Sequence, residues 1–137
     1  MIDVENDVFT IVASALRTAH SGIYVVGEYV PAPSSFPAVS IIEEDNRVAD
    51  RYMTDSVERA VLVMYEAQIF SNKVSGKKAE AKAIANTLDT AFTGLGFKRT
   101  MKDPVPNMND ATIYRIVCRY EAVIIPNDDS KFYVHTN

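Results

Sequence analysis

Apolar residues near the start of the chain recur every three or four positions. Over residues 4–19 this spacing forms one apolar stripe, which is typical of an amphipathic helix. Asp3 precedes the stripe as the expected N-cap, and Gly22 follows it as the expected stop signal. A second stripe of the same period follows Ser75, its expected N-cap, and ends before Gly96. The pattern therefore predicts two helices.

Segments rich in β-branched and aromatic residues lie between and after these helices. From Val57 onward, and again over residues 111–125, apolar and polar residues alternate, which predicts strands with one face on the core and one in water. Shorter strands are expected at residues 23–30, 38–44 and 96–101. The order helix, strand, strand, strand, helix, strand, strand predicts an α+β fold. Its antiparallel sheet has about five strands, with both helices on one face.

Length and composition predict one domain. The chain has 137 residues, of which 47% are apolar and 23% charged, as in single soluble domains. Residues 1–125 hold every predicted element and form the expected domain. Residues 126–137 combine acids with a short aromatic patch that is too small for a core of its own. We expect this C-terminal extension to need a partner to become ordered.

Charge and cysteine content argue against several classes of protein. The net charge of −4 argues against a protein whose main partner is a nucleic-acid backbone. Cys118 is the single cysteine, which argues against a disulfide framework and indicates a reducing cytoplasm. The N-terminus carries acids instead of the bases of a secretory signal, and no apolar run reaches the roughly 18 residues that cross a bilayer. Neither export nor a membrane partner is expected.

No catalytic set is recognisable in the sequence. His20 and His135 lie at a predicted helix end and in the extension, where solvated side chains are the favoured interpretation. Cys118 falls on the apolar face of a predicted strand, as a small buried hydrophobe does. The acids at residues 43–45 lack the spacing of a calcium loop. We therefore expect no enzymatic activity, no cofactor and no metal.

Basic residues gather around the second predicted helix. A nucleic-acid site would need aromatic side chains among them or an element that enters a groove, so a solvated face is the favoured interpretation. A contact between subunits is the intermediate alternative. The basic residues are Lys73, Lys77, Lys78, Lys82, Lys98, Arg99 and Lys102.

Two proline-rich segments, residues 28–43 and 104–116, are candidate docking surfaces. Proline limits the entropy that a loop loses on binding, although purely structural loops use proline as well. The second segment leads into a strand whose polar face carries two arginines. The expected contact residues are Tyr29, Pro31, Pro33, Phe36, Pro37, Pro104, Pro106, Arg115, Arg119 and, in the extension, Phe132 and Tyr133.

Four blocks of this sequence together suggest a family. They read EYVPAPSSFPAVSIIEEDN, VMYEAQIFSNKVSGKKAEAKAI, LGFKRT and PVPNMNDATIYRIVCRY. In order and spacing they resemble the tail terminator, or tail completion, proteins of long-tailed bacteriophages (siphophages) that infect mainly Gram-positive bacteria. The similarity spans residues 1–125 and rests on several blocks, while the chain after Ile125 departs from the family pattern.

The resemblance implies a structural protein without catalysis or cofactor. Such proteins form a ring, usually hexameric, on the last ring of the tail tube, where they stop its polymerisation and offer the tail to the head connector. The implied partners are further copies of the chain, the tail tube protein and the head-completion or connector protein, with DNA only passing through the lumen. The implied location is the virion neck, after assembly in the host cytoplasm.

Closed rings require two different patches on each subunit, and an open sheet edge and a rigid proline loop provide such patches. The aromatic end of the extension also offers a strand that can add to a neighbouring edge. Three alternatives stay open. A head-completion or stopper protein of the same virion would share these properties. A small cytoplasmic enzyme or ligand-binding domain would need convergent polar groups in an apolar pocket, and a DNA-binding module would need a positive face.

Overall fold

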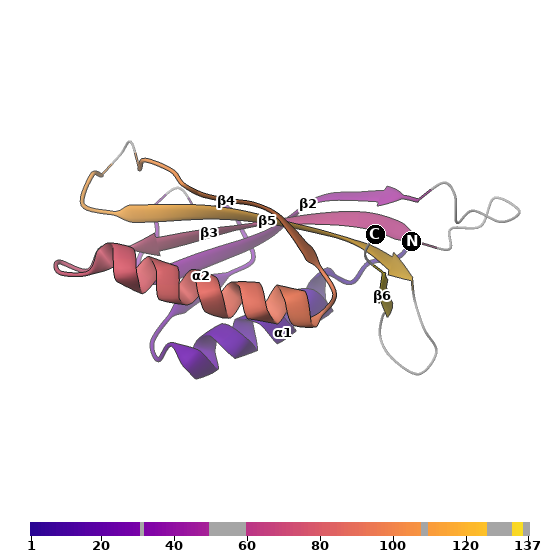
Figure 1. The fold of residues 1–137 in the computed structure, drawn as a ribbon, viewed down its shortest axis with the longest axis horizontal. Coiled ribbons are helices and arrows are strands. Elements are labelled where there is room, and N and C mark those ends of the chain that lie inside the picture. Colours follow the sequence, from indigo (N-terminus) through magenta and orange to yellow (C-terminus); the bar gives the residue numbers. More distant parts are fainter. Residues whose placement is uncertain (31, 50–59, 108–109, 126–132, 136–137) are drawn as a thin grey trace, which may run out of the picture.

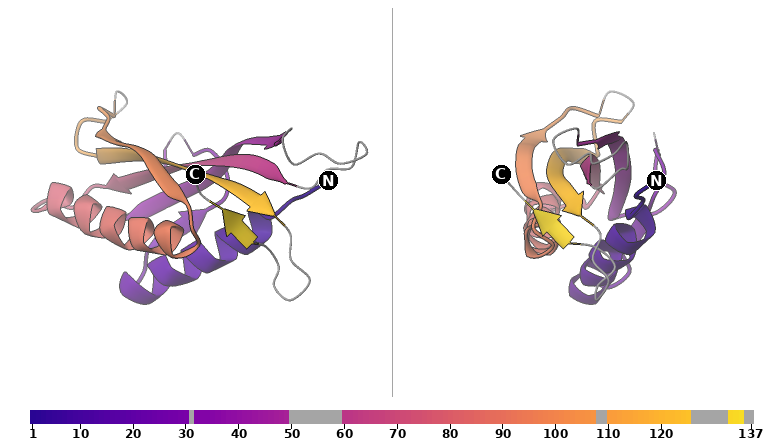
Figure 2. Two further views of the ribbon diagram at one scale, coloured as in Figure 1. Left: turned by 45° about the vertical axis from the view of Figure 1, so that its right-hand side comes forward. Right: turned by 90° about the vertical axis from the view of Figure 1, so that its right-hand side faces the viewer.

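One β-sheet carries both helices on a single face, as Figures 1 and 2 show. This computed structural model describes residues 1–30, 32–49, 60–107, 110–125 and 133–135, the last three by their backbone. The predicted α+β class and the predicted order of elements are confirmed. The elements are α1 (Glu5–Ala19), β1 (Tyr24–Val26), β2 (Ala38–Val48), β3 (Val61–Ser71), α2 (Lys77–Gly94), β4 (Lys98–Pro104), β5 (Tyr114–Ile125) and β6 (Tyr133–His135).

The strands lie in the order β1-β2-β3-β5-β4, and β6 pairs with the end of β5. All neighbours are antiparallel except β1 and β2, which run parallel with Tyr24 opposite Ala38. Residues 27–30 and 32–37, called the 27–37 segment below, carry the chain back to the starting end of the sheet before β2 begins, so these two strands point the same way. The sheet is therefore mixed, whereas the sequence predicts an antiparallel one.

The core lies between the sheet and the two helices. Alternate residues of β3 and β5 point into it and are buried, which confirms the alternation expected for these two strands. Aromatic rings form its centre. Phe92 of α2 stacks on Tyr120 with ring centroids 4.3 Å apart, and Phe97 meets Phe92 edge-on at 5.3 Å. These contacts fix α2 against the middle of the sheet.

Both helix N-termini differ from the expected caps. Val4, not Asp3, holds the N-cap position of α1, although the Asp3 carboxylate still accepts a hydrogen bond of 3.0 Å from the Glu5 N–H. Gly76, not Ser75, holds the N-cap position of α2, and neither Val4 nor Gly76 gives a side-chain cap. Gly76 has a φ of 92°, a left-handed conformation that glycine adopts without steric cost. The glycine expected to stop the second helix is confirmed, because Gly96 follows the helix with a φ of 93°.

Strand lengths differ from the prediction on both sides of the 27–37 segment. β1 covers only Tyr24–Val26 of the expected 23–30, and β2 continues through Asp45–Val48, beyond the expected strand end at residue 44. Asp45 to Val48 pair with β3 after a bulge at Glu44, and their polar side chains are tolerated because this end of β2 is partly in water. Val57, the first residue of the predicted alternation, lies outside the described residues.

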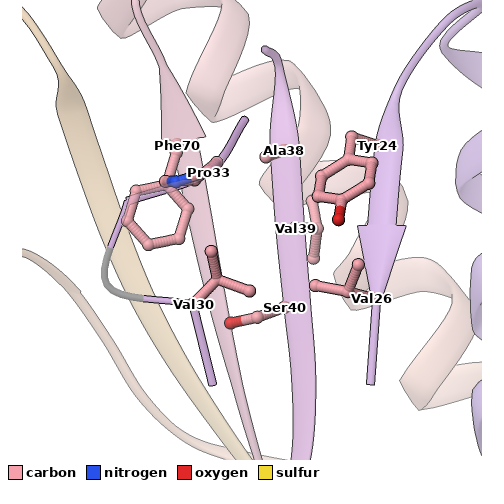
Figure 3. Close-up of a pocket in the computed structure, with 8 residues that line it drawn as sticks. All are labelled: Tyr24, Val26, Val30, Pro33, Ala38, Val39, Ser40 and Phe70. Atoms are coloured by element: carbon pink, nitrogen blue, oxygen red, sulfur yellow. The ribbon is translucent and has the colours of Figure 1, made fainter. Parts of the chain in front are cut away.

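The outer face of the sheet, opposite the helices, is only partly in water. The sequence predicts Gln68 on a wet face, but Gln68 is buried, as are Ser40 and Phe70. Figure 3 shows the reason: Val30 and Pro33, from the segment between β1 and β2, lie against this face beside the Phe70 ring. The 27–37 segment therefore covers one end of the outer face, and the sequence pattern does not reveal this contact.

Part of the C-terminal extension joins the protein's own sheet. Residues Tyr133–His135 form β6, with Tyr133 opposite Ile125 and His135 opposite Val123. The expectation that the extension orders only on a partner is therefore wrong for these three residues. The rest of the extension lies outside the described residues.

Candidate assembly surfaces

Two adjoining hollows mark the end of the molecule where β4 leads into β5. The first, which we call the lysine pocket, has a volume of about 230 Å³. The second, the proline pocket, has a volume of about 290 Å³. Lys78, Lys82, Lys102, Pro104, Tyr114 and Ile116 line the lysine pocket. Pro104, Val105, Pro106, Ile113, Tyr114 and Arg115 line the proline pocket.

The lysine pocket has a cationic rim and an apolar floor. Lys78 and Lys82 lie four residues apart on α2, so they share one helix face, and Lys102 approaches from β4. All three are exposed, and none takes part in an ion pair within the described part of the chain. Tyr114 and Ile116 supply the floor. This arrangement suits a segment that carries carboxylates beside apolar atoms.

The proline pocket brings together three of the expected contact residues, Pro104, Pro106 and Arg115. Both prolines are exposed. The Val105 N–H donates to the Arg115 carbonyl at 3.0 Å, which holds the turn against the start of β5. Pro104, Val105 and Pro106 therefore present a fixed surface, as a docking surface requires.

The first proline-rich segment is less available than the sequence suggests. Tyr29 is 65% exposed, whereas Phe36 and Pro37 are half-buried. Pro33 is buried against its own sheet, so it is not free to meet a neighbour. Pro31 lies outside the described residues, as does Phe132 in the extension, and Tyr133 is described only through its backbone in β6.

The two arginines of β5 point to the outer face, as the alternation predicts, but their surroundings differ. Arg119 leaves 45% of its side chain exposed and pairs with Glu66 at 3.7 Å. Arg115 is half-buried, donates to Gln68 and lies over the Phe70 ring. Arg119 is thus available to a neighbour, while Arg115 also belongs to the packing of the chain itself.

Three carboxylates gather at the opposite edge of the sheet, on the side of the helices. Asp3 and Glu5 lie at the start of α1, and Glu43 lies in β2, where it accepts a hydrogen bond of 3.2 Å from the Tyr65 hydroxyl. Partial burial raises the pKa of Glu43, the Tyr65 hydrogen bond opposes this, and the charges of Glu5 and Asp3 raise it further. We call Asp3, Glu5 and Glu43 the acidic cluster. The sequence does not reveal it, because Glu43 is far from Asp3 and Glu5 along the chain.

Of the residues considered for catalysis, His20 and Cys118 occupy structural positions, and His135 is described only through its backbone in β6. His20 shares a 2.8 Å hydrogen bond with the Thr87 hydroxyl, which links α1 to α2. Cys118 is buried beneath α2, and burial raises the pKa of its thiol to about 11. Among the described residues, no group of histidine, cysteine or acidic side chains has the geometry to hold a metal ion.

Comparison with known proteins yields a structural likeness only. No family model matches the chain, and no curated protein matches it. Among solved structures, its fold is similar to that of a chain in the virion of a native gene transfer agent (GTA) particle, with a TM-score of 0.58. The two share 17% sequence identity, over 83% of this chain and 91% of the other. At that identity the likeness shows the fold alone. Within the described residues, no helix has the length and apolarity needed to cross a membrane.

Proposed function

We propose that the protein is a structural component of a phage-like virion and, within it, the tail terminator. In this role it forms a ring, hexameric by family resemblance, that caps the tail tube, stops its polymerisation and joins the tail to the head connector. It catalyses no reaction. The observation that carries the proposal is the fold, which matches a chain of a GTA virion over 91% of that chain's length. The four sequence blocks add the narrower resemblance to terminators.

The two edges of the molecule support ring assembly. A closed ring is built from heterologous contacts, in which one patch of a subunit meets a different patch of the next. Here the edge at β4 and α2 carries the lysine pocket, and the edge at β2 and α1 carries the acidic cluster. Such unlike edges favour association of one subunit's β4 side with the next subunit's β2 side.

The features of the edge strand β4 disfavour an assembly in which copies add without limit by pairing their strands. It contains a bulge between Arg99 and Met101, exposed lysines at positions 98 and 102, and Pro104 at its end. Bulges, lysines and prolines on an edge strand discourage the addition of further strands. Contacts between copies would then depend on side chains, which can define a fixed number of subunits.

Tube assembly in the presence of the full-length protein tests the proposal. Tail tube protein polymerised with increasing amounts of the protein should give shorter tubes, with an extra ring of density at one end in electron micrographs. Binding to open head connectors without any effect on tube length would indicate the head-completion or stopper role. Tubes of unchanged length with bare ends, and connectors without bound protein, would contradict both virion roles.

A further inference from the structure

We infer that the lysine pocket of one copy binds the acidic cluster of the next copy. The occupant is thus a second copy of this chain, which places Asp3, Glu5 and Glu43 against Lys78, Lys82 and Lys102. The inference rests on ring assembly in the proposed function, because it specifies the contact between neighbouring subunits.

The two charged patches lie at opposite edges of the sheet but on the same side of it. β4 is the last strand on one side. On the other side, β1 pairs with β2 only as far as Ser40, so beyond Ser40 the edge of β2 that faces away from β3 has no partner strand among the described residues. The end-on view of Figure 2 shows α2 beneath the β4 side and α1 beneath the β2 side. Lys102 shares its pocket with α2, and Glu43 reaches the hydroxyl of Tyr65, whose ring packs on Phe92. Both patches therefore face the layer of the helices.

The pairing register sets how far apart the two patches lie along the strands. Glu43 lies opposite Tyr65, which lies opposite Tyr120 of β5. Lys102 lies opposite Cys118, two residues from Tyr120 and thus roughly 7 Å along the strand. Ile116 and Tyr114, which line the same pocket, lie four and six residues from Tyr120, roughly 13 and 20 Å along β5. Two copies placed side by side, with β4 of one beside β2 of the next, therefore need a shift of roughly 7 to 20 Å along the strands to bring the patches together. A rotation between such copies generates a ring.

Each patch lacks what the other supplies. No ion pair among the described residues neutralises the three lysines of the pocket. Glu43 lies partly buried beside two further carboxylates, an arrangement that disfavours its charge. Lysines of a neighbouring copy would favour that charge, and the floor of Tyr114 and Ile116 would keep water from the contact. Because the two patches carry opposite charges, the pocket of one copy should bind the cluster of the next and should not bind a second pocket.

Reciprocal charge reversal tests this contact with the full-length chain. The first variant, Lys78→Glu/Lys82→Glu, changes the pocket; the second, Asp3→Lys/Glu5→Lys, changes the cluster. The lysine variant keeps the fold, because added acids near the start of α2 suit the helix dipole. The control Lys73→Glu changes the net charge in the same direction but lies outside both the pocket and the β4 edge. Thermal unfolding of each variant verifies that it is folded, and native mass spectrometry and sedimentation report the assembly state.

We expect the wild type and the control to form closed oligomers, alone or on tube ends. Each reversal variant alone should need a concentration more than about tenfold higher to assemble. An equal mixture of the two should assemble again, because every Glu pocket then meets a Lys cluster and every Lys pocket meets an acidic cluster. Raising the salt from about 0.05 M to about 0.5 M should weaken wild-type assembly.

Four results would overturn the inference, and they separate it from the proposed function. If the wild type forms rings and either reversal variant does so equally well, the contact is wrong but the ring stands. The same holds if the mixture stays dissociated. If the wild type is monomeric at every concentration and on tube ends, the contact and the proposed ring are both wrong. If the lysine variant assembles normally but loses binding to labelled double-stranded DNA, the partner of the pocket is DNA.

Discussion

Arg115 donates a hydrogen bond of 2.9 Å from its Nη2 to Oε1 of Gln68, across the outer face of the sheet. Its guanidinium carbon also lies 5.8 Å from the centre of the Phe70 ring. Arg119 follows on the same face of the same strand, yet it is exposed, and within the described part of the chain its ion pair is with Glu66. The difference arises because the 27–37 segment covers one end of the outer face and leaves the other open.

The two arginines should therefore differ in their effect on stability. We expect Arg115→Ala to lower the free energy of unfolding by about 1 to 3 kcal/mol, because it leaves the buried Gln68 amide without its partner. Arg119→Ala removes a partly exposed ion pair and should cost less than about 0.5 kcal/mol. Urea unfolding of both variants gives the comparison. Equal losses would mean that the Gln68 contact contributes nothing to the fold.

The helices and the alternation of β3 and β5 follow from the sequence because each is a local pattern, set by residues close together in the chain. The parallel pairing of β1 and the burial of Gln68 are different. Both depend on where the 27–37 segment lies. The spacing of apolar residues along the chain does not predict that position. The acidic cluster could not be predicted for the same reason, because Asp3 and Glu43 come close only when the start of α1 lies beside β2 in the folded chain. The proline pocket is an intermediate case: Pro104, Pro106 and Arg115 are neighbours in sequence as well as in space.

Phe92 should be among the most sensitive positions in the core. It is fully buried and contacts three aromatic rings, those of Tyr65, Phe97 and Tyr120. Phe92→Ala should lower the free energy of unfolding by about 3 to 5 kcal/mol, because the rings around it cannot close the space. Thr93→Ala, at the exposed neighbouring position, is the control and should stay near the wild type in denaturant titrations. A loss below about 1 kcal/mol for Phe92→Ala would contradict the packing described.

Glu43 should make stability depend on pH. Its pKa in the fold lies above the ordinary value of 4.5, so the folded state binds more protons than the unfolded state between these two values. Stability therefore falls as the pH rises through this window, and the penalty persists at neutral pH. Glu43→Gln stays uncharged, retains an oxygen for the Tyr65 hydroxyl and should gain stability relative to the wild type as the pH rises.

Urea unfolding of the wild type and of Glu43→Gln, repeated across this pH range, checks the expectation. Glu28→Gln is the matched control, since Glu28 is an exposed carboxylate with no hydrogen bond to Tyr65. Its profile should run parallel to that of the wild type. A Glu43→Gln profile that is also parallel to the wild type would show that the carboxylate is as well solvated in the fold as in the unfolded chain.

Cys118 should be unreactive in the folded protein. The side chain is buried, and a pKa of about 11 leaves little thiolate near neutral pH. Ellman's reagent should therefore modify the native protein at least about a hundredfold more slowly than the urea-unfolded chain, because reaction requires opening of the core. Equal rates would place the thiol at the surface.

The C-terminal extension should contribute more to docking than to folding. Deletion of residues 127–137 removes β6, whose pairing with Val123–Ile125 is short. Each lost hydrogen bond costs about 0.5 to 1.5 kcal/mol, so the truncated chain should still fold cooperatively. In an assembled ring the loss recurs at every subunit, and tube capping should then require more protein. Phe132 and Tyr133 are the residues we expect to dock on a neighbour.

Val134→Pro separates docking from the pairing of β6 with β5. Proline disturbs the pairing opposite Ile124 but keeps both aromatic side chains in the chain. If the aromatic residues dock on a neighbour, the deletion should weaken capping while Val134→Pro caps nearly as well as the wild type. If both variants weaken capping equally, the extension acts through its pairing with β5, because only that pairing is lost in both. Wild-type capping by both variants would remove any role for the extension in assembly. A truncated chain that fails to fold would instead make β6 part of the domain.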